Sequence, residues 1–165
     1  MKKLKYLIIH CTATPKGREV SKEDILRWHT SPKHKGGRGW RQVGYTDLFP
    51  VGGGIINLVP FNQNEFVEGW EITNGVRGIN DVAKHIVYAG GLDKHRNPKD
   101  TRTTAQKKDL ETYIKYMILR HPDIEIAGHN EFSEYKACPS FDVPTWLESI
   151  CVVSKHIYNQ NNQTK

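Results

Sequence analysis

Cysteine is scarce in this sequence, and long apolar segments are missing. The 165 residues include three cysteines, Cys11, Cys138 and Cys151, which are too few for a disulfide framework. Because their number is odd, at least one of them is expected to be a free thiol or a metal ligand. No segment stays apolar over the ~18 residues that a membrane-spanning helix needs, so we predict no insertion into a membrane.

A Sec signal is also lacking. The N-terminal segment MKKLKYLIIHCTAT begins with basic residues and an apolar run, as a signal peptide does. The run LKYLII is too short for the apolar region of such a signal, and a histidine and a threonine-rich stretch follow it. We therefore expect synthesis in the cytoplasm, with any substrate beyond the membrane reached by another route.

Acidic residues are fewer than basic ones. The chain has 24 Lys and Arg against 18 Asp and Glu, a net charge of +6 and a pI of about 9.2. This balance favours an anionic partner such as nucleic acid, a membrane surface or an anionic cell-wall polymer, although a basic surface without a dedicated partner has the same composition. Because the sequence has neither an aromatic and basic stacking motif nor a recognition-helix pattern, we expect no nucleic acid partner.

Internal repeats and linkers are absent, and the length suits one domain with a single core. Apolar patterns predict strands over residues 4–11, 43–49, 54–59, 85–89 and 124–127. Helices are predicted over residues 22–30, 104–120 and 146–158, whereas residues 63–81 show no clear period. Interspersed strands and helices indicate an α/β fold with a mixed sheet flanked by helices. We assign residues 1–158 to this domain and 159–165 to a polar C-terminal tail.

Two histidines and one cysteine are placed to form a metal site. His10 ends the first strand, His129 follows the last strand by two residues, and Cys138 comes nine residues later. Two His and one Cys are a complete protein ligand set for a catalytic zinc, with one position left for water. Alternation along the strand turns Cys11 away from His10 and into the core. By spacing alone, a surface or hydrogen-bonded histidine and a small buried cysteine are the commoner interpretation.

Lys136 is expected close to this site. Pro139 biases Cys138 toward an extended conformation. Residues two apart in an extended chain face the same side, so the Lys136 ammonium would lie beside a Cys138 thiolate.

Four segments together resemble the type 2 family of zinc-dependent N-acetylmuramoyl-L-alanine amidases. They are IIHCTAT (8–14), VGYT (43–46), GHNEF (128–132) and KACPSFD (136–142), in this order, and the resemblance covers most of residues 4–147. This family shares its fold with amidase-type phage lysozymes and with peptidoglycan recognition proteins. The resemblance implies that residues 1–158 are an amidase catalytic domain with such a fold. It also implies one zinc ion and peptidoglycan or muropeptides as substrate.

The resemblance implies a role for each of five residues. His10, His129 and Cys138 would bind the zinc ion. Tyr45 would place its hydroxyl beside the catalytic water, and Lys136 would stabilise the developing oxyanion. Taken without the resemblance, Tyr45 would be an aromatic residue packed in a strand and Lys136 a solvated loop lysine.

Two positions depart from the pattern of the family. Thr46 follows the tyrosine where many relatives carry His or Asn, and His85 stands where Gly is usual. The region around His85 lines the substrate groove in relatives, so the substrate preference stays open.

The function predicted is hydrolysis of the amide bond between N-acetylmuramic acid and L-alanine, as in a phage or prophage endolysin. The alternative is a non-catalytic peptidoglycan-binding recognition module. Non-catalytic relatives commonly lack the cysteine ligand, so Cys138, with Tyr45 and Lys136, favours the enzyme. A monomer is expected. A secreted effector, a cytoplasmic enzyme that recycles wall fragments, and additional binding of a regulatory protein remain open.

Overall fold

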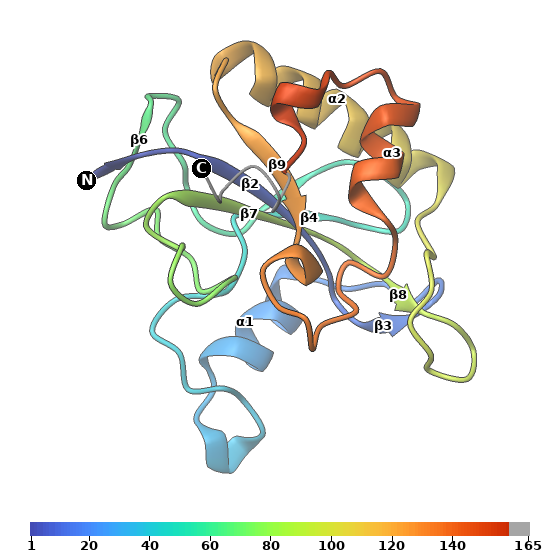
Figure 1. Cartoon of the computed structure of the whole chain (residues 1–165). Coiled ribbons are helices and arrows are strands. Elements are labelled where there is room, and N and C mark those ends of the chain that lie inside the picture. Colours follow the sequence, from blue (N-terminus) through green and yellow to red (C-terminus); the bar gives the residue numbers. More distant parts are fainter. Residues whose placement is uncertain (159–165) are drawn as a thin grey trace.

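The architecture is a single α/β domain built on a mixed sheet, seen in a computed structural model that describes residues 1–158 (Figure 1). The tail predicted over residues 159–165 lies outside the described residues. The central sheet has five strands in the order β5-β4-β7-β2-β9. Four of them are parallel, namely β4 (Asp47–Phe49), β7 (Ala83–Tyr88), β2 (Tyr6–Cys11) and β9 (Glu125–Gly128). The fifth, β5 (Ile56–Asn57), is antiparallel to β4. The predicted mixed sheet is therefore confirmed.

Two short ribbons flank the central sheet. The strand β1 (Lys2–Lys3) pairs antiparallel with β6 (Phe66–Val67), which lies inside the segment predicted to be irregular. The strand β3 (Thr14–Pro15) pairs parallel with β8 (Gly91–Leu92). The first ribbon lies near the start of β2, and the second continues the chain beyond the C-terminal ends of β2 and β7.

Helices cover both faces of the sheet. Figure 1 shows α2 (Thr104–Arg120) and α3 (Val143–Ser149) on one side and α1 (Lys22–Thr30) on the other. Both long helices begin with a capping box, at Ser21 for α1 and at Thr103 for α2, and both have the predicted bounds. Each box satisfies otherwise unpaired backbone N–H groups, so the start of the helix is encoded locally.

The pleat of β2 and β7 divides their side chains between two cores. Leu7, Ile9 and Ile86 pack under α2 and α3, whereas Val87 packs with Ile25 of α1. Because side chains alternate along a strand, His10 lies on the α1 side and Cys11 on the α2 side. Cys11 is indeed a buried member of the core under α2 and α3, as expected from the sequence.

The third helix and two of the strands differ from the sequence prediction. Helix α3 ends at Ser149 instead of continuing to residue 158, and it begins at the cap Asp142, whose carboxylate accepts the N–H of Thr145. The chain then turns back to the edge strand β9, where Tyr158 N donates to the carbonyl of Ile126. The unpaired backbone groups of the edge strand β9 thus offer the C-terminal residues hydrogen bonds that replace those of a longer α3 helix.

The strand predicted over residues 43–49 forms only at its end. The carbonyl of Val43 accepts from Asn74 N, and the N–H of Gly44 donates to His29 Nδ1 at 3.0 Å. These backbone groups pair with a loop and a side chain instead of a strand, so Tyr45 lies in a loop just before β4. The strand predicted over 54–59 shortens likewise to Ile56–Asn57.

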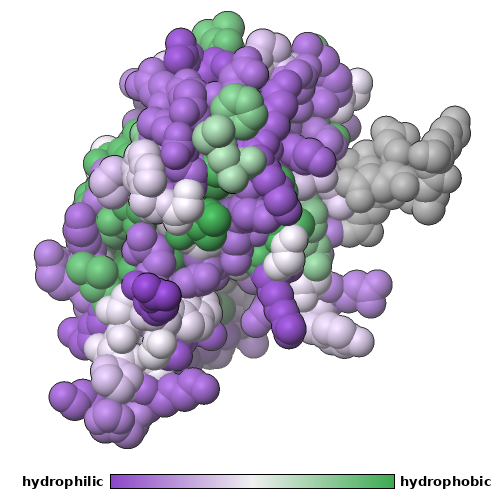
Figure 2. Space-filling view, turned by 90° about the vertical axis from the view of Figure 1, so that its left-hand side faces the viewer, coloured by the Kyte–Doolittle hydropathy of each residue, from purple (hydrophilic) through white to green (hydrophobic). Residues whose placement is uncertain are grey.

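A face of the molecule is shown in Figure 2, where hydrophilic residues predominate and hydrophobic ones occupy small areas. None of the helices within residues 1–158 is long and apolar enough to cross a membrane.

A buried ion pair lies between the sheet and α2. Lys84 Nζ is 3.4 Å from the Asp47 carboxylate, and neither side chain is more than 10% exposed. Asp47 also accepts a hydrogen bond from Tyr113 Oη at 2.5 Å and one from Asn57 Nδ2 at 2.8 Å. Burial lowers the pKa of Lys84, and Asp47 opposes this effect.

We expect Asp47→Asn to destabilise the fold by about 3 kcal/mol, because it leaves the Lys84 ammonium buried without its counter-ion. Urea unfolding measures the change. The matched control Glu111→Gln removes an exposed ion pair with Lys115 on α2 and should change little. Since removal of both charges is tolerated better than removal of one, adding Lys84→Met should restore part of the loss. Equal effects of Asp47→Asn and Glu111→Gln would contradict the stabilising role.

Candidate metal centre and its groove

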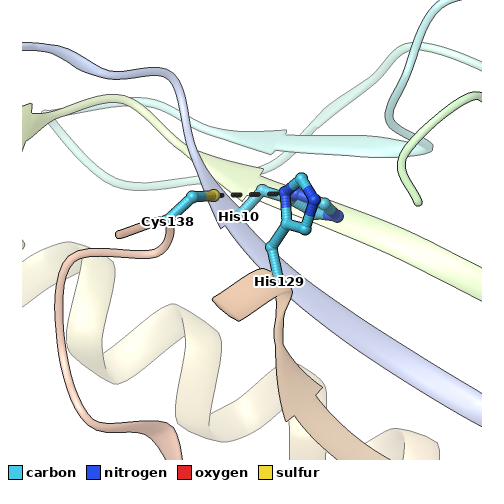
Figure 3. Close-up of side chains that lie close together, drawn as sticks. All are labelled: His10, His129 and Cys138. Carbon is cyan, nitrogen blue, oxygen red and sulfur yellow. Dashed lines mark hydrogen bonds between the residues drawn. The ribbon is translucent and has the colours of Figure 1, made fainter. Parts of the chain in front are cut away.

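The three predicted ligands come from separate elements and meet at one edge of the sheet. His10 is the second-last residue of β2, and His129 opens the 3₁₀ helix η2 (His129–Glu131) directly after β9. The pairing of Ile9 with Gly128 in these parallel strands brings the two histidines side by side. Cys138 enters from the loop between η2 and α3. Figure 3 shows the three side chains pointing toward one another.

The distances among the ligand atoms suit a zinc ion. One ligand atom from each of His10, His129 and Cys138 lies within 4.8 Å of the others. Cys138 Sγ is 3.7 Å from His10 Nδ1. In a tetrahedral site, with Zn–N about 2.05 Å and Zn–S about 2.3 Å, a nitrogen and a sulfur ligand are separated by about 3.6 Å. The donor set and its spacing therefore fit the metal that the sequence predicted.

The protonation states of the two histidines favour metal binding. Burial lowers the pKa of both His10 and His129, and the charge of Lys136 lowers that of His129 further, so both rings are neutral and offer a lone pair. Contact with the Cys11 thiol, followed by burial, raises the pKa of Cys138 in the metal-free protein. The N–H of Cys11 donates to Cys138 Sγ at 3.3 Å, and a cation would bind the thiolate in preference to the thiol.

Tyr45 and Lys136 lie next to the three ligands. The Tyr45 ring is 5.0 Å from the His10 ring, measured between centroids. Tyr45, Lys136 and His129 line one groove of about 400 Å³. Burial, followed by the nearby Cys138, raises the pKa of Tyr45, so its phenol is neutral at physiological pH. Lys136 is solvent-exposed at the groove.

Of the other groove residues, those within 74–80 belong to the region around His85 that the resemblance places in the substrate groove, whereas His29, Arg38 and Trp40 were not recognised from the sequence as site residues. The groove is also lined by His29, Arg38, Trp40, Asn74, Gly75, Arg77, Gly78 and Asn80. His29 accepts the N–H of Gly44, which leaves its Nε2–H as the donor, and Arg38 lies 5.0 Å over the Trp40 ring. For His29, Arg38 and Trp40, the only available signal was a polar or aromatic residue type near a turn, which is too common to identify a site.

A larger cavity of about 570 Å³ lies elsewhere on the molecule. It is lined by residues of the loop after β8, including Lys94 and Arg102, together with Pro15 and Lys16. None of the five predicted site residues belongs to it, so volume alone does not identify the site.

Acid should destabilise the zinc-free protein partly through His29. Burial lowers the pKa of His29 to about 4, against about 6.5 in the unfolded chain. The unfolded state therefore binds an extra proton between these values, and stability that is complete above pH 6.5 falls as the pH drops toward 4. The slope from one such histidine reaches about 1.4 kcal/mol per pH unit. Urea unfolding at several pH values should show a shallower slope for His29→Asn, and an unchanged slope would contradict the assignment.

The family model of N-acetylmuramoyl-L-alanine amidases, Amidase_2, matches residues 1–141. The chain belongs to this family. Its activity is that of a peptidoglycan amidase, the hydrolysis of the amide bond between N-acetylmuramic acid and L-alanine. The enzyme predicted from the sequence is therefore confirmed, in preference to a binding module without catalysis.

Individual relatives agree with this membership. The endolysin of Klebsiella phage KP32 is 27% identical over 142 residues, which cover 86% of this chain and 84% of the phage protein. The structure of the Ph2119 endolysin from Thermus scotoductus MAT2119 bacteriophage Ph2119 matches with a TM-score of 0.65 at 22% identity, covering 96% of this chain and 88% of that one. Drosophila PGRP-LB matches with a TM-score of 0.68 at 17% identity, covering 98% and 87%. These two structures show the fold shared with peptidoglycan recognition proteins.

Proposed function

We propose that this amidase is zinc-dependent, with one ion bound by His10, His129 and Cys138 at the floor of the groove. The observation that carries the proposal is the convergence of these three donors, at a spacing that fits tetrahedral zinc, beside Tyr45 and Lys136. Three protein ligands leave one coordination position open, as catalytic zinc sites do. The amidase catalytic domain then comprises residues 1–158.

When bound, zinc would supply Lewis-acid polarisation and a water acidic enough to attack an amide at neutral pH. The groove holds the scissile amide of the substrate across this position. The Lys136 ammonium stabilises the negative charge that develops on the carbonyl oxygen. The neutral Tyr45 hydroxyl donates a hydrogen bond and orients the water. The proton lost by the water passes to the amine of L-alanine as that amine leaves, and Tyr45 or solvent carries it.

The ligand set explains why a lysine is needed beside the metal. Two neutral histidines and one thiolate leave a zinc site with a net charge of about +1, where three histidines would leave about +2. Less positive charge at the metal weakens the stabilisation of an oxyanion. The Lys136 charge at the rim of the groove restores it.

The charge of the groove supports a muropeptide substrate. Arg38, Arg77 and Lys136 line the groove, and no acidic residue is among its described lining residues. The carboxylates of a peptidoglycan stem peptide would be attracted to this cationic surface. The phage endolysins among the relatives support a role in cell-wall lysis. We further propose that it acts as a monomer, without nucleic acid and without insertion into a membrane.

The test is mass spectrometry of purified peptidoglycan digested by the protein, with and without a zinc chelator. We expect stem peptides with a free L-alanine amine, lost with chelator and restored by added zinc. Release that persists with chelator would contradict the zinc dependence. Intact glycopeptides with retained wall binding would instead indicate a recognition module. If sacculi are neither cut nor bound, soluble muropeptides are the decisive substrate, and their survival with added zinc would overturn the proposal.

A further inference from the structure

His85 lies in the middle of β7 and is fully buried. Its Nδ1 is 3.0 Å from Nε2 of His10, across 75 residues of chain. The register of β2 against β7 pairs Ile8 with His85 and His10 with Val87, so His10 and His85 are diagonal neighbours on one face of the sheet. His85 is thus the direct partner of a proposed metal ligand.

The two nitrogens of His10 have different neighbours. Nδ1 faces Cys138 Sγ at 3.7 Å, and Nε2 faces His85 Nδ1 at 3.0 Å. A neutral imidazole has one N–H, and a nitrogen that binds a metal must present its lone pair. If Nδ1 of His10 binds the metal, Nε2 carries the hydrogen. His85 Nδ1 must then be the acceptor of that hydrogen bond.

The tautomer of His85 follows from this contact. With Nδ1 as acceptor, the hydrogen of the neutral His85 ring is on Nε2. The opposite arrangement, with His85 Nδ1 as donor, would place the hydrogen of His10 on Nδ1, toward Cys138, and would block metal binding. Both rings are buried, His10 1% exposed and His85 fully buried, so no solvent reaches the contact between their two nitrogens.

The surroundings keep the His85 ring in place. A methyl group at Gly75 would lie 2.2 Å from His85 Nδ1, so the backbone at Gly75 packs directly on the ring. The carbonyl of His85 accepts the N–H of Thr46 at 2.7 Å, which holds the strand against the segment that carries Tyr45. No protein atom within residues 1–158 pairs with His85 Nε2, although this atom is buried. Local hydrogen bonding therefore does not account for a histidine here, whereas the contact with His10 does.

We propose that His85 is a positioning residue of the metal centre, which accepts the Nε2–H of His10 and so keeps Nδ1 of His10 directed at the zinc. This inference rests on the proposed zinc site. Metal-binding histidines usually donate to a carboxylate, a carbonyl oxygen or water. An imidazole acceptor is neutral, so it orients the ligand without adding negative charge beside the metal. The Cys138 thiolate would lower the positive charge of the site, and a neutral His85 would not lower it further.

A matched pair of variants tests the acceptor. In His85→Asn, Oδ1 takes about the place of Nδ1 and keeps an acceptor, whereas His85→Leu has nearly the same shape and none. Zinc affinity is measured by competition with a chromophoric chelator, and the geometry by the absorption spectrum of the cobalt(II)-substituted protein. We expect His85→Leu to lower zinc affinity by about 10- to 100-fold and to alter the cobalt spectrum. His85→Asn should stay close to the wild type in both.

Each outcome has a definite meaning. Wild-type affinity and spectrum in His85→Leu, or equal losses in Leu and Asn variants that are both folded, would overturn the role of His85 while leaving the zinc site intact. A wild-type protein that binds no zinc would overturn the proposed function itself.

A second measurement needs no variant. Long-range ¹H–¹⁵N NMR of the histidine rings should show His85 with its hydrogen on Nε2 in the zinc-loaded protein. A hydrogen on Nδ1 of His85 in the zinc-loaded protein would overturn the inference even if the variants fail to fold.

Discussion

Cys138→Ser should abolish zinc binding and lower kcat/KM on peptidoglycan by on the order of 10³-fold or more, since a catalytic metal contributes several kcal/mol. Serine keeps the size of the side chain but replaces a thiolate with a neutral hydroxyl, which is a poor zinc ligand. The N–H of Cys11 that donates to Sγ would still be satisfied by the serine oxygen, so the fold should be retained. Metal analysis by mass spectrometry gives the zinc content, and release of L-alanine amines gives the rate.

Cys151→Ser is the matched control for this variant. Cys151 is a free, exposed thiol at the end of α3, and the same substitution there removes no donor of the zinc site. We expect full zinc content and full activity. A Cys138→Ser protein that retains one zinc per chain and wild-type activity would show that Cys138 is not a ligand.

Lys136→Ala should lower kcat by about 10²- to 10³-fold, the usual effect of removing one group that stabilises an oxyanion. Zinc content should not change, because Lys136 is not among the three donors of the site. KM should change less than kcat if the lysine acts mainly on the charge that develops during the reaction. Steady-state kinetics on a soluble muropeptide, together with metal analysis of the same preparation, separates these quantities.

Two further variants give this prediction its controls. Lys136→Arg keeps a cation at the rim of the groove and should recover part of kcat. Lys155→Ala removes an exposed lysine from the 3₁₀ helix η3 (Ser154–His156), outside the groove lining, and should leave kcat unchanged. Loss of zinc from Lys136→Ala in proportion to its loss of activity would refute the assigned role.

Local sequence signals were sufficient for the long helices. The bounds of α1 and α2 match the prediction because Ser21, Asp24, Thr103 and Gln106 form capping boxes within four residues of chain. The strand β2 was recognisable because its side chains are almost all buried and apolar. The C-terminal helix was predicted with wrong bounds, since the hydrogen bond of Tyr158 to β9 depends on an edge strand distant in sequence.

The five proposed site residues were also named from the sequence, but by two different routes. Spacing alone suggested His10, His129 and Cys138 as metal ligands. Only the resemblance to a family made this hypothesis stronger than the alternative of ordinary surface histidines and a small buried cysteine. Tyr45 and Lys136 came from the resemblance entirely. The structure places Tyr45, Lys136 and His129 along one groove and brings His10 and Cys138 next to His129. The roles of all five in binding and catalysis are proposals that the variants above test.

Amino-acid order was therefore enough to predict the α/β class, the family and the residue types of the proposed zinc site. The reason is that helix caps, buried strands and short motifs are contiguous in the chain. It was not enough to predict the contact between His10 and His85 or the cationic lining by Arg38 and Arg77. Those features depend on the register of β2 against β7 and on where two long loops pack. Strand register and loop packing depend on many weak contacts throughout the core. These contacts join segments that are distant in the chain, so no single segment encodes them.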